Sequence, residues 1–357
     1  NSLGIQPDFV ICRSEKFLDQ RRRDRLALFC NVTPENVISS PDLPSVYQVP
    51  LILEDQKLAE KILSRVGLPV RKSNLSDWKK FVDKVKKVKE KKDGIEIAII
   101  GKYFGTGDYQ LRDSYAALFD AIDHASYELG IAVKTHWIDA QKAENNDNLN
   151  ELIGNPDGII VPIGWGLRGA EGMIKAAGYA RDKKIPYLGL CYGMQLGVIS
   201  YARDVLGIKN ANTEENDEKG SDLVIHLMPK QKEIMKRRAY GGTMRLGSWE
   251  AIVKKGTKAY TLYDKYNDFI DKPKGLTSER HRHRFEFNND YLEKFEKKGF
   301  IISARSVEED LVEIIELPEN EHPYYMGTQG HPEYKSRPLR PHPLFLGFIE
   351  AVSRLKK

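Results

Sequence analysis

The chain has 357 residues, enough for two domains, and 41% of them are apolar, enough for a folded core. Its formal net charge is only +5, with both signs interspersed, so composition gives no argument for a nucleic-acid-binding protein. Three scattered cysteines argue against a disulfide scaffold and have no metal-ligand spacing. No apolar run is long enough to cross a membrane, and no signal-peptide pattern is present, so we expect a cytoplasmic protein without a metal site.

Residues 1–70 hold short apolar stretches without enough strands to close a parallel sheet. Phe9–Cys12 and Leu26–Cys30 have the pattern of apolar strands, and a third apolar stretch follows at 46–53. Asp55–Val66 has the pattern of an amphipathic helix. Because the opening residues lack Met and run at once into a strand-like segment, we expect this region to be the remnant of a longer domain.

Residues 71–94 change in character and predict a lysine-rich helix. Ser76 is a suitable N-cap, and apolar side chains then recur at helical spacing, at Trp78, Val82, Val85 and Val88. Lysines occupy the other positions. They suit either a nucleic-acid or membrane patch or the solvated face of a linker helix, and we favour the linker because charge runs usually only solvate a helix.

From Ile95 onwards, strand and helix patterns alternate. Strands are expected at 95–101, 132–138, 158–162 and 186–190, and helices at 109–129, 171–183 and 194–206. This alternation predicts an α/β fold with an open, mostly parallel sheet flanked by helices, extending over 95–357. Ligands of such sheets bind where strands end and helices begin.

The segment Gly189-Leu190-Cys191-Tyr192-Gly193 lies at one of these junctions. A nucleophile between two glycines, after a strand and before a helix, is typical of a nucleophile elbow. The helix N-terminus favours a thiolate, and the N–H of Tyr192 is placed to stabilise an oxyanion. The alternative is a small buried cysteine, which is the commoner role of a lone cysteine.

A cysteine nucleophile needs a base, and His331 is the candidate. Glu333 lies two residues further on, and on an extended segment it projects to the same side as the histidine and can orient it. The alternative is a surface histidine beside a proline. Gly164, in the glycine-rich turn after the preceding strand, is the candidate for a second oxyanion N–H donor.

The run Arg280-His281-Arg282-His283-Arg284 is the remaining unusual segment. If it is extended, its three arginines share one face, and like charges so close favour an anionic ligand such as a carboxylate or phosphate. A metal site on the two histidines has little support without further ligands. A solvated edge strand is the alternative.

Taken together, these residues resemble the CTP synthase family over essentially the whole chain. The segments that carry the resemblance to its glutaminase domain are GLCYGMQ (189–195), VPIGWGLRGAEG (161–172), NANTEE (210–215), ERHRHRFEFN (279–288) and HPEYKSRPLRPHPLFLGF (331–348). Residues 1–70 resemble the end of the family's synthase domain.

The resemblance implies a role for each motif residue in glutamine hydrolysis. Cys191 would attack the carboxamide and release ammonia, with His331 as general acid and base and Glu333 as its orienter. No cofactor is implied for this step. L-Glutamine would be held by Gly164, Tyr192, Gly193, Met194, Gln195, Glu215 and Arg284, with the Gly164 and Tyr192 N–H groups as the oxyanion hole.

The resemblance also implies nucleotides and an assembly. In the family, ammonia reaches a synthase domain that uses ATP and Mg2+ to convert UTP to CTP, GTP activates the glutaminase, and tetramers form through the synthase domain. The GTP-linked positions would be Arg168, Gly169, Glu171 and Arg282. On the synthase side, the nucleotide-contacting positions would be Arg25, Phe29, Pro41, Asp42 and Leu43.

Several residues depart from the family pattern. Ile163 stands where glycine is usual, Tyr192 where leucine is usual, Arg25 where lysine is usual, and Gly330 where an aromatic residue is usual. No G-x-x-x-x-G-K-[ST] phosphate loop occurs in these 357 residues, so only the glutaminase half-reaction is expected of this chain.

Two other classes of function remain open from the sequence. Another cysteine hydrolase on the same fold, such as a γ-glutamyl hydrolase or a peptidase, would use the same nucleophile and base. A non-catalytic regulatory module would have no need of Cys191, His331 and Glu333 together. No nucleic-acid or membrane partner is expected.

Overall fold

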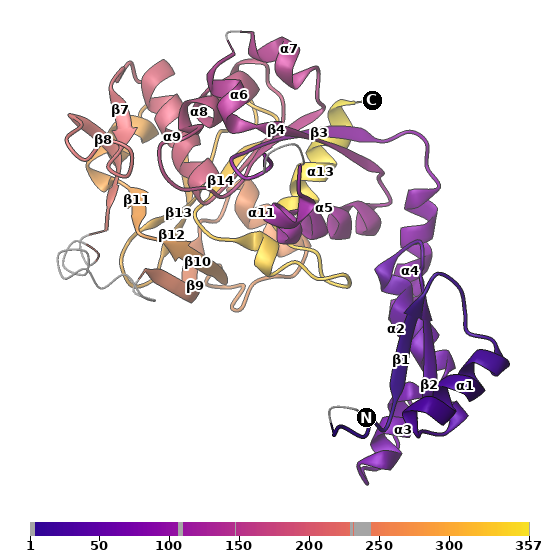
Figure 1. Cartoon of the computed structure of the whole chain (residues 1–357). Helices are drawn as coiled ribbons and strands as arrows, with labels where there is room; N and C mark the ends of the chain where they lie inside the picture. Colours follow the sequence, from indigo (N-terminus) through magenta and orange to yellow (C-terminus); the bar gives the residue numbers. More distant parts are fainter. Residues whose placement is uncertain (1–3, 106–109, 147, 229–230, 232–243, 357) are drawn as a thin grey trace. The chain divides into compact units, whose positions relative to one another are not determined.

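The computed structural model describes residues 4–105, 110–146, 148–228, 231 and 244–356, and it divides into two units, Asn1–Lys89 and Glu90–Lys357 (Figure 1). In the described part of the chain, no helix has both the length and the apolar character needed to span a membrane.

The smaller unit is built on two parallel strands, β1 (Val10–Ser14) and β2 (Val37–Pro41). Four helices accompany them: α1 (Gln20–Cys30), α2 (Val49–Asp55), α3 (Leu58–Arg65) and α4 (Ser76–Lys89). Several large apolar side chains remain exposed on this unit, among them Ile11 and Leu28.

The strand expected at Leu26–Cys30 is wrong, because these residues form the last turns of α1. The Asp19 carboxylate caps this helix by accepting a hydrogen bond from the Arg22 N–H at 2.8 Å, and Asn31 ends it in the left-handed conformation. A short apolar run does not distinguish a strand from part of a helix, and the deciding signal was the cap several residues upstream.

Helix α4 begins at Ser76 and carries the apolar stripe that its spacing predicted. Val82, Val85 and Val88 are buried, whereas the lysines are exposed. The Trp78 indole N–H donates to the Tyr47 carbonyl at 2.8 Å, and the Phe81 ring meets the Tyr47 ring edge-on at 5.0 Å. These contacts attach the start of the helix to the smaller unit.

The larger unit contains most of the regular structure. Its strands are β3 (Ile95–Gly101), β4 (Val133–Asp139), β5 (Gly158–Val161), β6 (Tyr187–Leu190), β7 (Ala211–Thr213), β8 (Asp222–Leu227), β9 (Arg245–Val253), β10 (Leu276–His283), β11 (Phe285–Phe287), β12 (Ile301–Ser306), β13 (Val312–Glu316) and β14 (Tyr325–Thr328). Its helices are α5 (Ala116–Leu129), α6 (Ala140–Glu144), α7 (Leu149–Ile153), α8 (Ala170–Asp182), α9 (Tyr192–Asp204), α11 (Lys258–Lys265), α12 (Leu292–Glu296) and α13 (Pro343–Leu355). The helix expected from Tyr109 is observed from Ala116, and Tyr109 itself lies outside the described residues.

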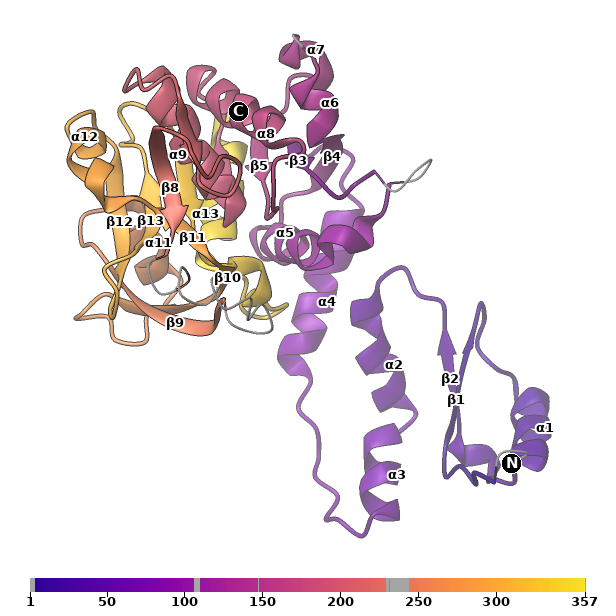
Figure 2. The same cartoon turned by 60° about the vertical axis from the view of Figure 1, so that its left-hand side comes forward.

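A nine-stranded sheet forms the centre of this unit, in the order β10-β9-β12-β13-β14-β6-β5-β3-β4. The five strands from β14 to β4 are parallel, and the others extend the sheet with antiparallel pairings. Helices α8 and α9 pack on one face, and α5, α11 and α13 pack on the other (Figures 1 and 2). The expected α/β sheet flanked by helices is therefore confirmed.

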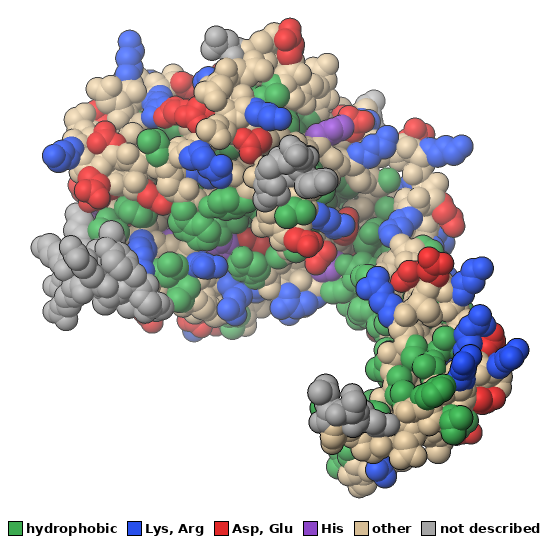
Figure 3. Space-filling model, viewed as in Figure 1, with side chains coloured by type: hydrophobic (Ala, Val, Ile, Leu, Met, Phe, Trp, Pro, Cys, Tyr) green, Lys and Arg blue, Asp and Glu red, His purple; other side chains and the backbone are tan. Residues whose placement is uncertain are grey.

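The surface of the larger unit shows no segregation of charge in the view of Figure 3, where basic and acidic side chains are mixed.

A second sheet, in the order β11-β8-β7, packs beside α9. Adjacent parallel strands β5, β6 and β14 all end at the same edge of the large sheet. Because the chain leaves these strands at Gly164, Cys191 and His331, the fold brings the three candidate segments together.

Candidate active site

Cys191 occupies a strained turn between strand β6 and helix α9. Its backbone has φ 51° and ψ −101°, and its side chain is 2% exposed. Such a positive φ is costly for a residue with a side chain and persists only where the surroundings impose it. Here the Cys191 N–H is held by the Thr328 carbonyl at 2.7 Å, which extends the ladder between β6 and β14. The turn therefore has the backbone strain of a nucleophile elbow.

His331 and Glu333 form a buried pair directly after β14. The imidazole Nδ1 lies 2.7 Å from Glu333 Oε1, and the His331 side chain is fully buried. Although burial opposes it, the negative charge of Glu333, with that of a Cys191 thiolate, raises the pKa of His331 well above its usual value. The other ring nitrogen, Nε2, is buried without a hydrogen-bond partner among the described residues, so it remains available for proton transfer.

A cavity of about 210 Å³ opens onto the thiol. Its lining residues are Gly164, Trp165, Cys191, Tyr192, Gln195, Glu215, Met244, His283, Arg284 and Phe285. Of the seven positions predicted to bind the amino acid, Gly193 and Met194 are not in this wall. Met194 is fully buried in the core, and Gly193 packs against the Val161 backbone.

The other five of these seven positions line the cavity. They are Gly164, Tyr192, Gln195, Glu215 and Arg284. The Arg284 guanidinium also donates a hydrogen bond to the Gln231 side chain. An acidic and a basic side chain therefore share the cavity wall with the thiol.

The turn that carries Gly164 is held by side chains around Gly166. The Gly166 N–H donates to Glu215 Oε1 at 2.9 Å, and its carbonyl accepts from the Tyr192 hydroxyl at 2.9 Å and from the Lys102 ammonium. Lys102 is 3% exposed, and burial lowers its pKa to about 8. Burial also raises the pKa of Glu215. Tyr192, which departs from the usual leucine, thus adds a hydrogen bond to this turn.

The positions expected to be linked to GTP are spread over several contacts. Arg168 donates to the Lys102 carbonyl at 3.0 Å, and the Gly169 N–H donates to Glu144 at 2.8 Å. Glu171 accepts two hydrogen bonds from Arg203, at 2.6 and 3.0 Å, so its carboxylate is already engaged. The Arg282 guanidinium lies over the Trp165 ring, 5.3 Å from its centroid.

The expected nucleotide positions lie in the smaller unit. Arg25 and Phe29 are exposed on α1 and, at i and i+4, share one face of that helix. Pro41 ends β2, and the Asp42 N–H donates to the Ser14 carbonyl at 2.8 Å. Leu43 follows directly, half-buried.

The Arg-His run is extended, in β10, and its two histidines are buried whereas Arg280 and Arg282 are exposed. Arg245 lies 3.1 Å from His281 Nδ1 and 3.3 Å from His283 Nε2. Burial lowers the pKa of His283 to about 3, so the ring is neutral at pH 7. His281 Nδ1 and both His283 nitrogens thus have protein partners, and His281 Nε2 lies 3.5 Å from a Glu313 carboxylate oxygen, which gives no support to a metal site on these two histidines.

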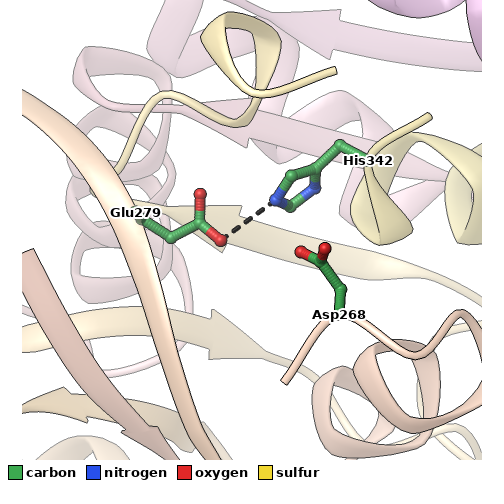
Figure 4. A group of neighbouring side chains, drawn as sticks. All are labelled: Asp268, Glu279 and His342. Atoms are coloured by element: carbon green, nitrogen blue, oxygen red, sulfur yellow. Dashed lines mark hydrogen bonds and ion pairs between the residues drawn. The ribbon is translucent and has the colours of Figure 1, made fainter. Parts of the chain in front are cut away.

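A different group has the composition of a metal site: Asp268, Glu279 and His342, all buried (Figure 4). The His342 Nε2 lies 3.0 Å from Glu279 Oε1, and Arg340 pairs with Asp268. Lys335 lies 3.4 Å from Glu279. The two carboxylates are thus balanced by two cations, and we interpret the group as a structural ion-pair network behind the loop that carries His331.

Sequence reasoning missed two residues at the site. Lys102 follows β3 and reaches the Gly164 turn, and Gln329 follows β14 and lies 3.5 Å, through its Nε2, from Cys191 Sγ. Gln329 sits two residues before His331, so its place beside the motif was visible. Nothing in the sequence indicated that its side chain points to the thiol.

This arrangement defines a class of chemistry. A strained cysteine at a helix N-terminus, beside a histidine held by a carboxylate, is suited to nucleophilic attack on an acyl carbon. The fold and the site therefore define a cysteine-dependent acyl-transfer enzyme or hydrolase.

Comparisons with known proteins narrow this class. Residues 110–351 match the family described as glutamine amidotransferase class-I, and residues 1–68 match the one described as CTP synthase N-terminus. The chain is 48% identical over 355 residues to the CTP synthase of Caldanaerobacter subterraneus and 47% identical over 354 residues to that of Saccharolobus solfataricus. Each alignment covers 99% of this chain but 62% of the relative, so the chain spans less than two thirds of their length.

A solved structure gives a similar result. The glutaminase domain of Trypanosoma brucei CTPS, with bound acivicin, matches with a TM-score of 0.62 and 32% identity, over 73% of this chain and 94% of that one. The chain therefore belongs to the class-I glutamine amidotransferase family and, within it, to the CTP synthases.

Proposed function

We propose that this chain carries the glutaminase part of a CTP synthase and hydrolyses L-glutamine to glutamate and ammonia. The observation that carries the proposal is the convergence of Cys191, the His331–Glu333 pair and an amino-acid-sized cavity at one sheet edge. The family membership of the chain supports glutamine as the substrate.

The chemistry follows from the geometry. The Cys191 thiolate attacks the carboxamide carbon, and the N–H groups of Gly164 and Tyr192 stabilise the oxyanion. His331, protonated beside Glu333, gives its proton to the departing amine, so ammonia leaves and a thioester remains. His331 then takes a proton from water, which attacks the thioester and releases glutamate and the thiol.

Glutamine recognition uses the charged side chains of the cavity wall. A carboxylate binds an ammonium group and a guanidinium binds a carboxylate, so Glu215 takes the α-amino group and Arg284 the α-carboxylate. Gln195 and Tyr192 complete the wall around the side-chain amide. In this proposal Gly193 and Met194 contribute by shaping the turn rather than by touching the substrate.

The complete enzyme would use the ammonia to aminate UTP with ATP and Mg2+, and GTP would activate the glutaminase through Arg168, Gly169, Glu171 and Arg282. Residues 1–70 would be the end of the synthase domain, 71–94 a linker helix and 95–357 the glutaminase domain. The exposed Ile11 and Leu28 fit a unit that continues into a larger domain. Arg25, Phe29, Pro41, Asp42 and Leu43 would contact nucleotide there, with tetramers forming through that domain in the cytoplasm.

A γ-glutamyl hydrolase or peptidase is the competing function, since it would use the same three catalytic residues. The paired charges of Glu215 and Arg284 favour a substrate that carries an α-ammonium and an α-carboxylate on one residue, which an α-linked peptide does not offer within its chain. The match of residues 1–68 to the synthase family also favours the glutaminase.

The test is a covalent label. The chain is treated with a diazo-ketone analogue of glutamine and its intact mass is measured, with Cys191→Ala as the control. We expect one adduct on Cys191 that free glutamine prevents, together with glutamate release from glutamine. Labelling that glutamine does not prevent, with cleavage of γ-glutamyl peptides instead, would favour the competing function.

A further inference from the structure

Gln329 is fixed beside the nucleophile by both its main chain and its side chain. It directly follows β14, and its N–H donates to the Glu313 carbonyl at 2.8 Å. Its side chain is 1% exposed, and Nε2 lies 3.5 Å from Cys191 Sγ, within hydrogen-bond range for sulfur. The steps of the proposed mechanism do not use this amide.

The direction of the amide follows from its neighbours. Side-chain amide N and O atoms are assigned from their hydrogen bonds, and here the chain of bonds starts at the Phe285 carbonyl, which only accepts. It lies 2.9 Å from Gln195 Nε2, which must therefore be the NH2 group. The same NH2 donates to Gln329 Oε1 at 3.0 Å, so the NH2 of Gln329 is the group that faces the sulfur.

A donor aimed at sulfur favours the thiolate over the thiol, because a hydrogen bond to the charged form stabilises that form. The effect matters at Cys191 because the side chain is almost fully buried and has little access to water. The imidazolium of His331 supplies charge, and Gln329 supplies a fixed dipole.

We propose that Gln329 is a further catalytic residue, whose side-chain N–H stabilises and orients the Cys191 thiolate, and that Gln195 holds it in this direction. That the thiolate attacks glutamine rests on the proposed function, whereas the ionisation of Cys191 does not. A simple alkylating agent therefore tests the inference without glutamine.

The experiment measures the rate of Cys191 alkylation by iodoacetamide from pH 5 to 10, followed by peptide mass so that Cys12 and Cys30 are scored separately. The first variant, Gln329→Met, keeps the side-chain length but removes the N–H donor. The second, Gln329→Glu, places a carboxylate oxygen, which cannot donate, opposite the Cys191 sulfur. The midpoint of the profile should rise by about one pH unit for Gln329→Met, lowering the rate at pH 6 about tenfold. It should rise further for Gln329→Glu, and the high-pH rate should not change.

Gln56→Met is the matched control. Gln56 also uses its amide in partly buried main-chain contacts, donating to the Ser39 and Ile52 carbonyls at 2.8 and 3.0 Å, but it lies in the smaller unit. Its profile should match that of the parent. If either Gln329 substitution prevents folding, Gln195→Met leaves Gln329 in place without its anchor and should raise the midpoint by a smaller amount.

A midpoint equal to that of the parent in the folded variants would overturn the inference, as would a rate reduced equally at every pH, which is the result of a purely structural role. Glutamate release by the parent is measured in parallel. If the alkylation midpoint shifts as expected in the Gln329 variants but the parent does not hydrolyse glutamine, the proposed function is overturned and the inference on Gln329 stands.

Discussion

Gly189 and Gly193, the two glycines that flank the nucleophile, pack backbone against backbone. A Cβ placed on Gly189 would lie 2.8 Å from the Gly193 carbonyl carbon, and one placed on Gly193 would lie 1.9 Å from the Val161 carbonyl oxygen. Neither position can accept a side chain without moving main chain. The glycines thus allow helix α9 to approach strands β5 and β6 closely enough to form the elbow.

The first prediction is that Gly193→Ala disrupts the site. Overpacking against fixed backbone should cost about 3 kcal/mol of unfolding free energy, and displacement of the elbow should lower glutamine hydrolysis by about 100-fold. Denaturant unfolding and glutamate release measure the two effects.

The control is Gly197→Ala, one turn further along α9, where the nearest atoms to a Cβ are the Tyr325 and Tyr187 hydroxyls at 3.3 and 3.4 Å. These side chains can adjust, so this variant should keep its activity. Equal losses in the two variants would contradict the proposed role of the close backbone approach.

The second prediction concerns the charge on His331. Glu333→Gln removes the carboxylate that raises the pKa of His331, so this pKa should fall, and hydrolysis should drop at least tenfold. The stability contributed by the raised pKa is fully present below about pH 6.5 and is lost as pH rises through the folded-state pKa, so this contribution should shrink in the variant. NMR titration of 15N-labelled histidine, with His331→Asn for assignment, measures the shift; an unchanged titration would contradict it.

How far the site could be predicted from the sequence depended on whether its residues lie in local motifs. The elbow around Cys191 and the pair of His331 and Glu333 each lie within a few residues, and alternating strands and helices indicated which ends meet. Lys102 and Gln329 are long side chains that reach the site from neighbouring strand ends, and their direction is set by packing. The helix at Leu26–Cys30 was missed because its cap, Asp19, lay outside the apolar run.

The third prediction is that Tyr192→Phe loosens the turn that carries Gly164. The lost hydroxyl leaves the Gly166 carbonyl to Lys102 and removes the contact with the Asn216 side chain, which together should cost about 1 kcal/mol and lower kcat about fivefold. Tyr201→Phe is the control, because it removes one hydrogen bond, to the Lys298 carbonyl, from the same helix α9. It should lose similar stability but keep kcat, and a parallel loss of kcat would contradict the specific role of Tyr192.

The fourth prediction tests the ion-pair network of Figure 4. Glu279 is fully buried, and although burial opposes it, His342, Lys335 and Tyr263 lower its pKa to about 2. Glu279→Leu should cost about 3 kcal/mol because it leaves cations without their partner. A chelator should leave the melting temperature of the parent unchanged; a fall on chelation, restored by a divalent metal, would contradict the structural interpretation.

The last prediction uses His322, which is 1% exposed and does not line the cavity at Cys191. Its Nε2 lies 3.1 Å from the Ala180 carbonyl and its Nδ1 accepts the Tyr324 N–H at 3.1 Å, so the ring is neutral. Burial lowers its pKa to about 4. A lowered pKa contributes stability that is present above about pH 6.5 and is lost as pH falls through about 4, an amount of about 3 kcal/mol.

His322→Gln keeps a donor for Ala180 but does not titrate, so its unfolding free energy should fall less than that of the parent between pH 7 and 4, by about 3 kcal/mol. Denaturant unfolding at several pH values measures the difference. The exposed His136 provides the control, since His136→Gln should retain the parent's pH dependence. If the unfolding free energies of His322→Gln and the parent fall in parallel with pH, protonation of His322 does not drive acid unfolding. The loss of stability at low pH would then arise at other buried groups such as His283.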